Sequence, residues 1–351
     1  MSGIGEVLKT ARQAKGMTQG ELAEAAQMTQ AALSRYENDL RAPEPEALER
    51  LARALGVTPD LLGRGVRIEG GIAVAAHMRR RATAKPTVWR ALEARLNMLR
   101  LHTTALHEEI NMSSDRHVPS FDPDVDPPEY AARMVRVQWR LPIGPVHSLS
   151  PWMEAAGVLI AEADFGAGAK VDGLSQWATD YPIVMLNSSS PSDKKRLTLA
   201  HELGHLVLHS QYGGDDMEQQ ANAFAAELLM PEAEIKPMLR GRLTLGKFVD
   251  LKRYWGTSIQ SLIERAYSLD LITRDERTSF WKQLSARGWR TNEPASDEIP
   301  VENPRLTRHI ADSLEARGLT ASEIATLSGF HRPADNDIFV GSRRRGHLTS
   351  A

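Results

Sequence analysis

The chain has 351 residues, of which 42% are hydrophobic and 25% are charged, and its formal net charge is −2. At roughly 100 to 200 residues per domain, this length predicts two or three domains. The absence of cysteine excludes disulfide frameworks, cysteine-ligated metals and a cysteine nucleophile, so any metal must be held by histidine and carboxylate groups. The near-neutral charge argues against a protein that coats nucleic acid. No apolar run reaches the ~18 to 20 residues of a membrane helix, and we expect a soluble cytoplasmic protein without membrane partners.

Residues 1–63 predict five short helices with clear start and stop signals. Thr18 and Glu21 have the spacing of a capping box, in which each side chain satisfies a free backbone N–H group at a helix start. Thr29 is a good N-cap for the next helix, so the second and third helices are joined by a very short turn. A fourth helix ends at Gly56, and a threonine followed by proline opens the fifth.

Residues 64–129 predict a basic helical connector followed by a linker rich in proline and aspartate. Between residues 64 and 100, nine Lys and Arg residues face two Glu residues, which gives a local charge of +7. A helix is expected over residues 88–110, and the linker over 119–129.

A second domain is expected to begin near Tyr130. Apolar β-rich runs at 158–160 and 183–186 indicate a small sheet. Helices are expected at 131–140, 192–210 and 215–230, with more helix to about residue 285. The predicted fold class is therefore mainly α with a small β-sheet, that is, α+β.

Residues 306–351 predict a helical pair and a mobile basic tail. The sequence around Thr320 echoes that around Thr18, which raises the alternative of a second helix-turn-helix. Pro333 falls where the reading helix of such a motif would run, so the plain helical pair is favoured.

The strongest chemical signal is the run from His201 to His205, which reads His-Glu-Leu-Gly-His. Residues four apart share one helix face, so both imidazoles can bind one metal ion, and Glu202 is placed to act on a water molecule. A chance histidine pair is the alternative, but the apolar residues on the opposite face favour a buried helix beside a cleft.

A catalytic zinc site normally has a third protein ligand. Glu218 on the following helix is the favoured candidate. Asn222 shares its face and is expected to orient a ligand by a hydrogen bond. Glu227 lies about 180° round that helix and is expected to be solvated or structural. His209 lies a full turn too far along its own helix and is expected to be structural. Tyr212 is a weak candidate for stabilising an oxyanion.

Residues 196–209 and 218–231 resemble the ImmA/IrrE family of metallo-endopeptidases, and the similarity extends over about residues 85–305. The resemblance implies a zincin-like peptidase domain over 130–235 with a helical C-terminal part over 236–305. It implies His201, His205 and Glu218 as ligands of Zn²⁺ or Mn²⁺, and Glu202 as the catalytic carboxylate. It also implies repressors of the helix-turn-helix type as substrates.

Residues 1–63 resemble the XRE family of helix-turn-helix domains, with residues 29–38 as the reading helix. Early side chains of a reading helix meet base edges, while flanking residues meet phosphates, and Gln19 is also expected to contact Gln30. The predicted DNA-binding residues are Gln19, Thr29, Gln30, Ala31, Ser34, Arg35 and Arg41. Through Arg64, eight basic residues face nine acidic ones, a charge of −1, so the phosphate attraction of this unit alone is weak. The basic segment could supply further DNA contacts or be a solvated helix face.

The leading hypothesis is a transcriptional regulator that binds a double-stranded DNA operator as a homodimer and cuts a helix-turn-helix repressor. The cut repressor would be a separate protein or the chain itself, at a hinge around residues 110–128. Two alternatives remain open. The protease-like domain could sense a ligand or partner without cutting, or the helix-turn-helix domain could dock protein substrates.

Overall fold

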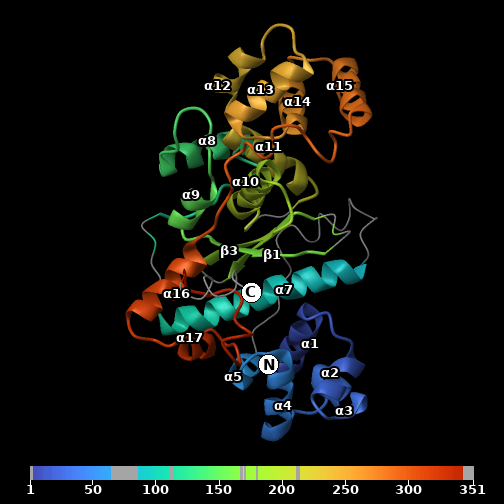
Figure 1. The fold of residues 1–351 in the computed structure, drawn as a ribbon, viewed down its shortest axis with the longest axis vertical. Coiled ribbons are helices and arrows are strands. Elements are labelled where there is room, and N and C mark those ends of the chain that lie inside the picture. Colours follow the sequence, from blue (N-terminus) through green and yellow to red (C-terminus); the bar gives the residue numbers. More distant parts are fainter. Residues whose placement is uncertain are drawn as a thin grey trace.

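The computed structural model describes residues 3–64, 86–110, 114, 116–166, 169, 171–178, 181–210 and 214–342. These residues form a mainly helical protein with one three-stranded sheet, which confirms the predicted fold class (Figure 1). None of the described helices has the length and apolar character that crossing a membrane requires.

Five helices form the N-terminal unit, as predicted. They are α1 (Ile4–Ala14), α2 (Gln19–Ala25), α3 (Gln30–Glu37), α4 (Pro45–Leu55) and α5 (Pro59–Gly63). The capping box of Thr18 and Glu21 is present, and Thr29 accepts a hydrogen bond from the N–H of Ala32. Gly56 ends α4 with φ +67°, a conformation that glycine adopts without steric cost.

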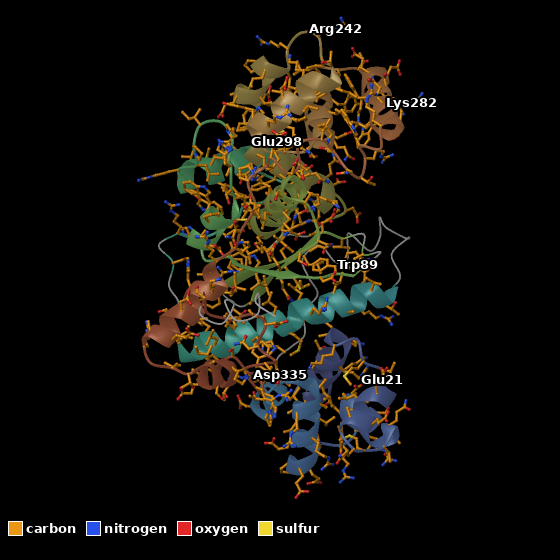
Figure 2. The ribbon with its side chains drawn as sticks, viewed as in Figure 1. Glu21, Trp89, Arg242, Lys282, Glu298 and Asp335 are labelled. Carbon is orange, nitrogen blue, oxygen red and sulfur yellow. The ribbon has the colours of Figure 1, made fainter. Side chains whose placement is uncertain are left out.

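The long helix α7 (Pro86–Glu109) lies between this unit and the sheet (Figure 1). On one side Met98, Leu101 and Ala105 are buried in the core of the five helices. Another set of its side chains, which includes Trp89 (Figure 2), packs against the sheet; the others are Leu92, Leu96, Leu99 and Leu106. The segment predicted as a connector therefore supplies a helix shared by two hydrophobic cores.

Of the four basic residues of the connector that the structure describes, Arg64, Arg95 and Arg100 are held by the protein itself, whereas Arg90 is exposed. Arg64 pairs with Asp60 and Glu108. Arg95 donates a hydrogen bond to the backbone carbonyl of Asp164, and Arg100 is buried. For Arg64, Arg95 and Arg100 these contacts favour neither DNA contact nor a plain solvated face, whereas the exposed Arg90 fits both alternatives. The remaining basic residues lie outside the described residues: Arg67, Arg79, Arg80, Arg81 and Lys85.

The sheet has the order β1-β3-β2 and consists of β1 (Leu159–Ala163), β2 (Gly173–Ala178) and β3 (Tyr181–Asn187). The central strand β3 pairs parallel to β1 and antiparallel to β2. Helix α7 covers one face and α10 (Ser192–Leu208) the other, so β3 is almost entirely buried (Figure 1). Strands β1 and β3 were predicted, whereas β2 was not.

Helix α10 packs against α8 (Pro128–Trp139) and α11 (Met217–Leu229), and the short α9 (Ser150–Ala155) packs on β1. Four further helices extend this helical core away from the N-terminal unit (Figure 1): α12 (Glu232–Leu239), α13 (Leu245–Trp255), α14 (Ile259–Ser268) and α15 (Arg274–Ala286). Their apolar side chains share one core with α8, α10 and α11.

The predicted linker at 119–129 is packed against the fold in its first half. Val118 is buried, and the N–H of Phe121 donates a 2.9 Å hydrogen bond to the carbonyl of Val207 near the end of α10. The first half of the predicted linker is therefore anchored to the fold by apolar residues.

The C-terminal helices α16 (Leu306–Ala316) and α17 (Ala321–Leu327) form the plain pair that the sequence favoured, since no reading helix follows them in the described residues up to Ser342. The chain then returns to the N-terminal unit. A β-bridge joins Phe330 to Val57, and the N–H of Thr58 donates to the carbonyl of Gly329.

The segment before the predicted mobile basic tail is held against the fold as far as Ser342. Phe339 is buried, and Ser342 donates two hydrogen bonds to Asp312. Pro294, Pro300 and Pro304 lie between α15 and α16, and Pro333 follows α17. Residues 343–351, which contain the basic run Arg343 to Arg345, lie outside the described residues.

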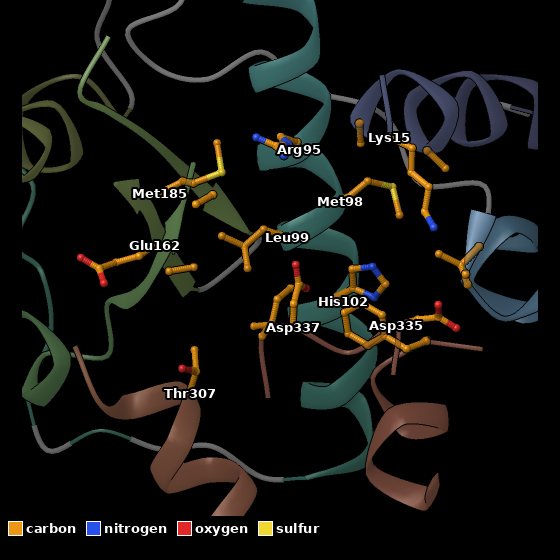
Figure 3. Close-up of a pocket in the computed structure, with 18 of the residues that line it drawn as sticks. Lys15, Arg95, Met98, Leu99, His102, Glu162, Met185, Thr307, Asp335 and Asp337 are labelled. Atoms are coloured by element: carbon orange, nitrogen blue, oxygen red, sulfur yellow. The ribbon is translucent and has the colours of Figure 1, made fainter. Parts of the chain in front are cut away.

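A cavity of about 400 Å³ lies where the N-terminal unit, α7, the sheet and the C-terminal segment meet (Figure 3). His102 on α7 is buried beside it and stacks on Phe330, with ring centroids 3.8 Å apart. Its Nδ1–H donates a hydrogen bond to the carbonyl of Ser328. Burial lowers the pKa of His102 to about 4, because the apolar surroundings disfavour the charged ring.

Candidate metal centre

Helix α10 places two imidazoles on one face. His201 and His205 are one turn apart, and their Nε2 atoms are 3.1 Å from each other. The opposite side of the helix is fully buried through Leu199, Leu203 and Leu206. Packing of this apolar side fixes the direction in which both histidines point.

Close contact between α10 and α11 brings the third group to the pair. A Cβ atom at Gly204 would lie 3.2 Å from the backbone of Ala221, so these two small residues allow the helices to approach. Glu218, one turn before Ala221, then reaches both rings. Its Oε2 lies 3.7 Å from His201 Nε2, and its Oε1 lies 3.3 Å from His205 Nε2.

The three groups fit a tetrahedral metal ion. Ligand bonds of about 2.0 to 2.1 Å give a tetrahedral edge of roughly 3.3 Å. The two Nε2 atoms are 3.1 Å apart and Glu218 Oε1 is 3.3 Å from His205 Nε2, both close to this value, while the 3.7 Å distance to His201 Nε2 belongs to the other carboxylate oxygen, Oε2. Among the described residues, His201, His205 and Glu218 are the group of side chains that could hold a metal ion. Two imidazoles and a carboxylate suit zinc, and with weaker affinity manganese.

Each histidine has a side-chain partner at its other ring nitrogen. His201 Nδ1 lies 3.0 Å from Oδ1 of Asn222, the residue predicted to orient a ligand. His205 Nδ1 lies 2.9 Å from Nδ1 of His209, whose Nε2 lies 2.8 Å from Gln220 Oε1. Burial lowers the pKa of His209 to about 4. His209 is thus not among the three grouped ligands, but it contacts one of them.

Glu202 is held beside the centre by strand β2. Ser175 Oγ donates a 2.7 Å hydrogen bond to Glu202 Oε2, and both side chains are buried. A Cβ atom at Gly173 would lie 2.5 Å from Thr198 Cγ2 and 3.2 Å from Glu202 Oε1, so the strand approaches α10 this closely because residue 173 has no side chain. Sequence reasoning missed Gly173 and Ser175, since nothing local marks their strand.

The two rejected or weak candidates lie elsewhere. Glu227 is buried rather than solvated, and its carboxylate pairs with Arg133 and Arg265. Tyr212 lies outside the described residues.

A groove of about 1000 Å³ runs beside the centre, between α10 and α11 on one side and α14 on the other. Asn222 lines it, so the groove adjoins the contact that holds His201. Its wall is mixed, with Leu197 and Met230 among polar residues such as Gln219. This volume is large enough to receive several side chains of a peptide.

The predicted DNA-reading side chains are on the surface of the N-terminal unit. Those of α3 and its flanks are exposed or, for Ser34, half-buried: Thr29, Gln30, Ala31, Ser34, Arg35 and Arg41. Gln19 differs from expectation, because its Nε2 donates a 2.8 Å hydrogen bond to Glu37. Glu37 is itself paired with buried Arg12, and among the described hydrogen bonds none joins Gln19 to Gln30.

Comparison with known proteins assigns both parts of the chain. Residues 153–267 match the family model described as an IrrE N-terminal-like domain of the M78 peptidases. Residues 8–62 match the model of a helix-turn-helix domain. The resemblance to ImmA/IrrE peptidases with a helix-turn-helix domain is confirmed. The peptidase match contains α10 and α11 and therefore every residue of the candidate metal centre.

A curated relative supports the same assignment over a short stretch. The chain is 35% identical over 74 residues to the radiation response metalloprotease IrrE of Deinococcus radiodurans. The similarity covers 17% of this chain and 23% of that protein, so the chain spans less than a quarter of the relative's length. The helix-turn-helix domain joined to a metallopeptidase-type domain indicates a regulator with a protease-like part.

Proposed function

We propose that this protein is a DNA-binding transcriptional regulator with zinc-dependent endopeptidase activity, which cuts a helix-turn-helix repressor and so releases the genes that the repressor silences. The observation that carries the proposal is the convergence of His201, His205 and Glu218 at tetrahedral spacing, with Glu202 next to the first ligand. A protease-like domain that only sensed a ligand would not need this complete set.

The chemistry assigned to the chain's own residues centres on Glu202. A zinc ion held by His201, His205 and Glu218 would supply Lewis acidity, which would polarise a peptide carbonyl and lower the pKa of the attacking water so that it gives up a proton more readily. The Glu202 carboxylate takes the proton of the attacking water and passes it to the leaving amine. The hydrogen bond from Ser175 to Oε2 holds the carboxylate in one orientation while its other oxygen receives the proton.

The substrate and partners follow from the arrangement of the two domains. The groove between α11 and α14 receives an extended or looped segment of the repressor. The exposed reading helix binds a double-stranded operator, and two half-sites imply a homodimer. Self-cleavage near residues 110–128 is the less favoured route, because the Phe121 N–H is hydrogen-bonded to Val207 near the end of α10 and this holds the segment against the fold.

The test is co-expression of the full chain with candidate helix-turn-helix repressors, followed by a search for a clipped repressor. Purified chains are also analysed for bound zinc. We expect Glu202→Gln to keep zinc and lose cleavage, and His205→Ala to lose both. Full cleavage by the Glu202→Gln chain would refute the mechanism.

DNA binding needs a gel shift at a stated salt concentration with the whole chain. A fragment ending at residue 100 would cut α7 and remove Leu101 and Ala105 from the core of the N-terminal unit. We expect Arg35→Ala to weaken a specific shift, with Arg53→Ala on α4 as the control. A wild-type chain that shifts no operator while still capturing a repressor would favour the docking alternative.

A further inference from the structure

The imidazole of His209 is built into the surroundings of the metal ligands without being one of them. It follows the last residue of α10, one turn beyond His205, and is only 6% exposed. The two rings lie 5.1 Å apart between centroids, with the Nδ1 atoms 2.9 Å from each other. On its far side, His209 Nε2 meets Oε1 of Gln220 on α11.

The hydrogen atoms of this chain can be placed in one consistent order. His205 Nε2 faces Glu218 and His201, so a metal ion there takes the lone pair of that nitrogen and the ring proton must be on Nδ1. His205 Nδ1–H then donates to His209 Nδ1, which must be the unprotonated nitrogen. His209 therefore carries its proton on Nε2 and donates it to the amide oxygen of Gln220.

We propose that His209 and Gln220 are positioning residues for the metal centre, which hold His205 in the tautomer and ring orientation that a metal ion requires. This assignment rests on the proposed metal-dependent function. Partners of this kind raise the basicity of a ligating imidazole and fix its direction. Asn222 contacts the Nδ1 atom of His201 in the same way. One helix, α11, therefore supplies the third ligand and the two side-chain amides that support the histidine ligands.

A plain helix-capping role does not explain the contacts. A cap would use a ring nitrogen to satisfy a free carbonyl in the last turn of α10. Both nitrogens of His209 instead meet side chains in the described hydrogen bonds. The ring thus connects a ligand to a second helix.

The experiment measures the zinc Kd of the full chain by competition with a chromophoric chelator, and the thermal unfolding of the metal-free chain. In His209→Leu the acceptor for His205 is removed, and we expect zinc to bind about 10- to 100-fold more weakly. In His209→Asn an amide oxygen stands near the position of Nδ1, and we expect rescue to within about threefold of the wild type.

Gln220 provides a second variant that leaves both histidines in place. Gln220→Leu removes the acceptor for His209, and we expect the zinc Kd to increase about threefold to tenfold. Gln219→Leu on the same helix is the matched control, because Gln219 is exposed and is expected to leave the Kd unchanged. If His209→Leu does not fold, the difference in zinc Kd between Gln220→Leu and Gln219→Leu tests the proposal.

Nitrogen-detected NMR of the zinc-loaded wild type gives a readout independent of catalysis. The proposal requires His205 protonated on Nδ1 and His209 on Nε2. The proposal is overturned if His209 carries its proton on Nδ1, if His209→Asn and His209→Leu weaken zinc equally, or if Gln220→Leu matches Gln219→Leu. A wild-type chain that binds no zinc would overturn the proposed function itself, and this outcome is distinct from those that overturn only the positioning role of His209 and Gln220.

Discussion

Acid should destabilise this protein in a way that depends on His102. The ordinary pKa of histidine is 6.5, but the pKa of His102 is about 4 in the folded chain because its ring is buried where α7 packs on Phe330. The unfolded chain therefore binds more protons below pH 6.5, and the folded state loses free energy of unfolding as the pH falls from 6.5 to 4. Proton uptake by the two states gives a loss of about 2 kcal/mol between pH 7 and 5, and about 3 kcal/mol by pH 4.

The assay is urea unfolding of the metal-free full chain at pH 7 and pH 5, followed by tryptophan fluorescence. His102→Gln is the comparison, because its amide can still donate to the Ser328 carbonyl but does not titrate. Other groups titrate in the same window, and they cancel in the difference between the two chains. We expect the wild type to lose about 2 kcal/mol more than His102→Gln. An equal loss in both chains would refute the reasoning.

Three further changes test other parts of the structure. Glu302→Gln should cost about 3 to 5 kcal/mol in urea unfolding, because it leaves the fully buried Arg196 without its partner charge, whereas Glu298→Gln on the surface should change little. Phe330→Ala should lower the free energy of unfolding by about 3 to 5 kcal/mol and speed proteolysis where the segment after α17 meets the N-terminal unit. A variant as resistant to protease as the wild type would contradict the stabilising contact with His102. Gly173→Ala should displace Glu202 and slow repressor cleavage about a hundredfold at unchanged zinc Kd; normal cleavage would count against the placement by β2.

The sequence by itself determined the features that depend on residues close together in the chain. Caps such as Thr18 and Thr29 act on N–H groups two or three residues away, so helix starts were predictable. His201 and His205 share a face because of the helical period, and the same period selected Glu218 with Asn222. The residues of the candidate metal centre could therefore be picked out from the sequence.

Only the tertiary structure decided which faces meet. The periodicity of α7 predicted a helix but not that two cores would share it, because the pattern does not name the partner of each face. Strand β2 has no strong alternation of its own and is fixed by pairing with β3, which is what places Ser175 on Glu202. The distance of His209 along the helix could be predicted from the sequence, but its contact with Gln220 depends on how α11 packs on α10. Such contacts join residues whose separation is set by packing, and local sequence rules extend only over about one helical turn.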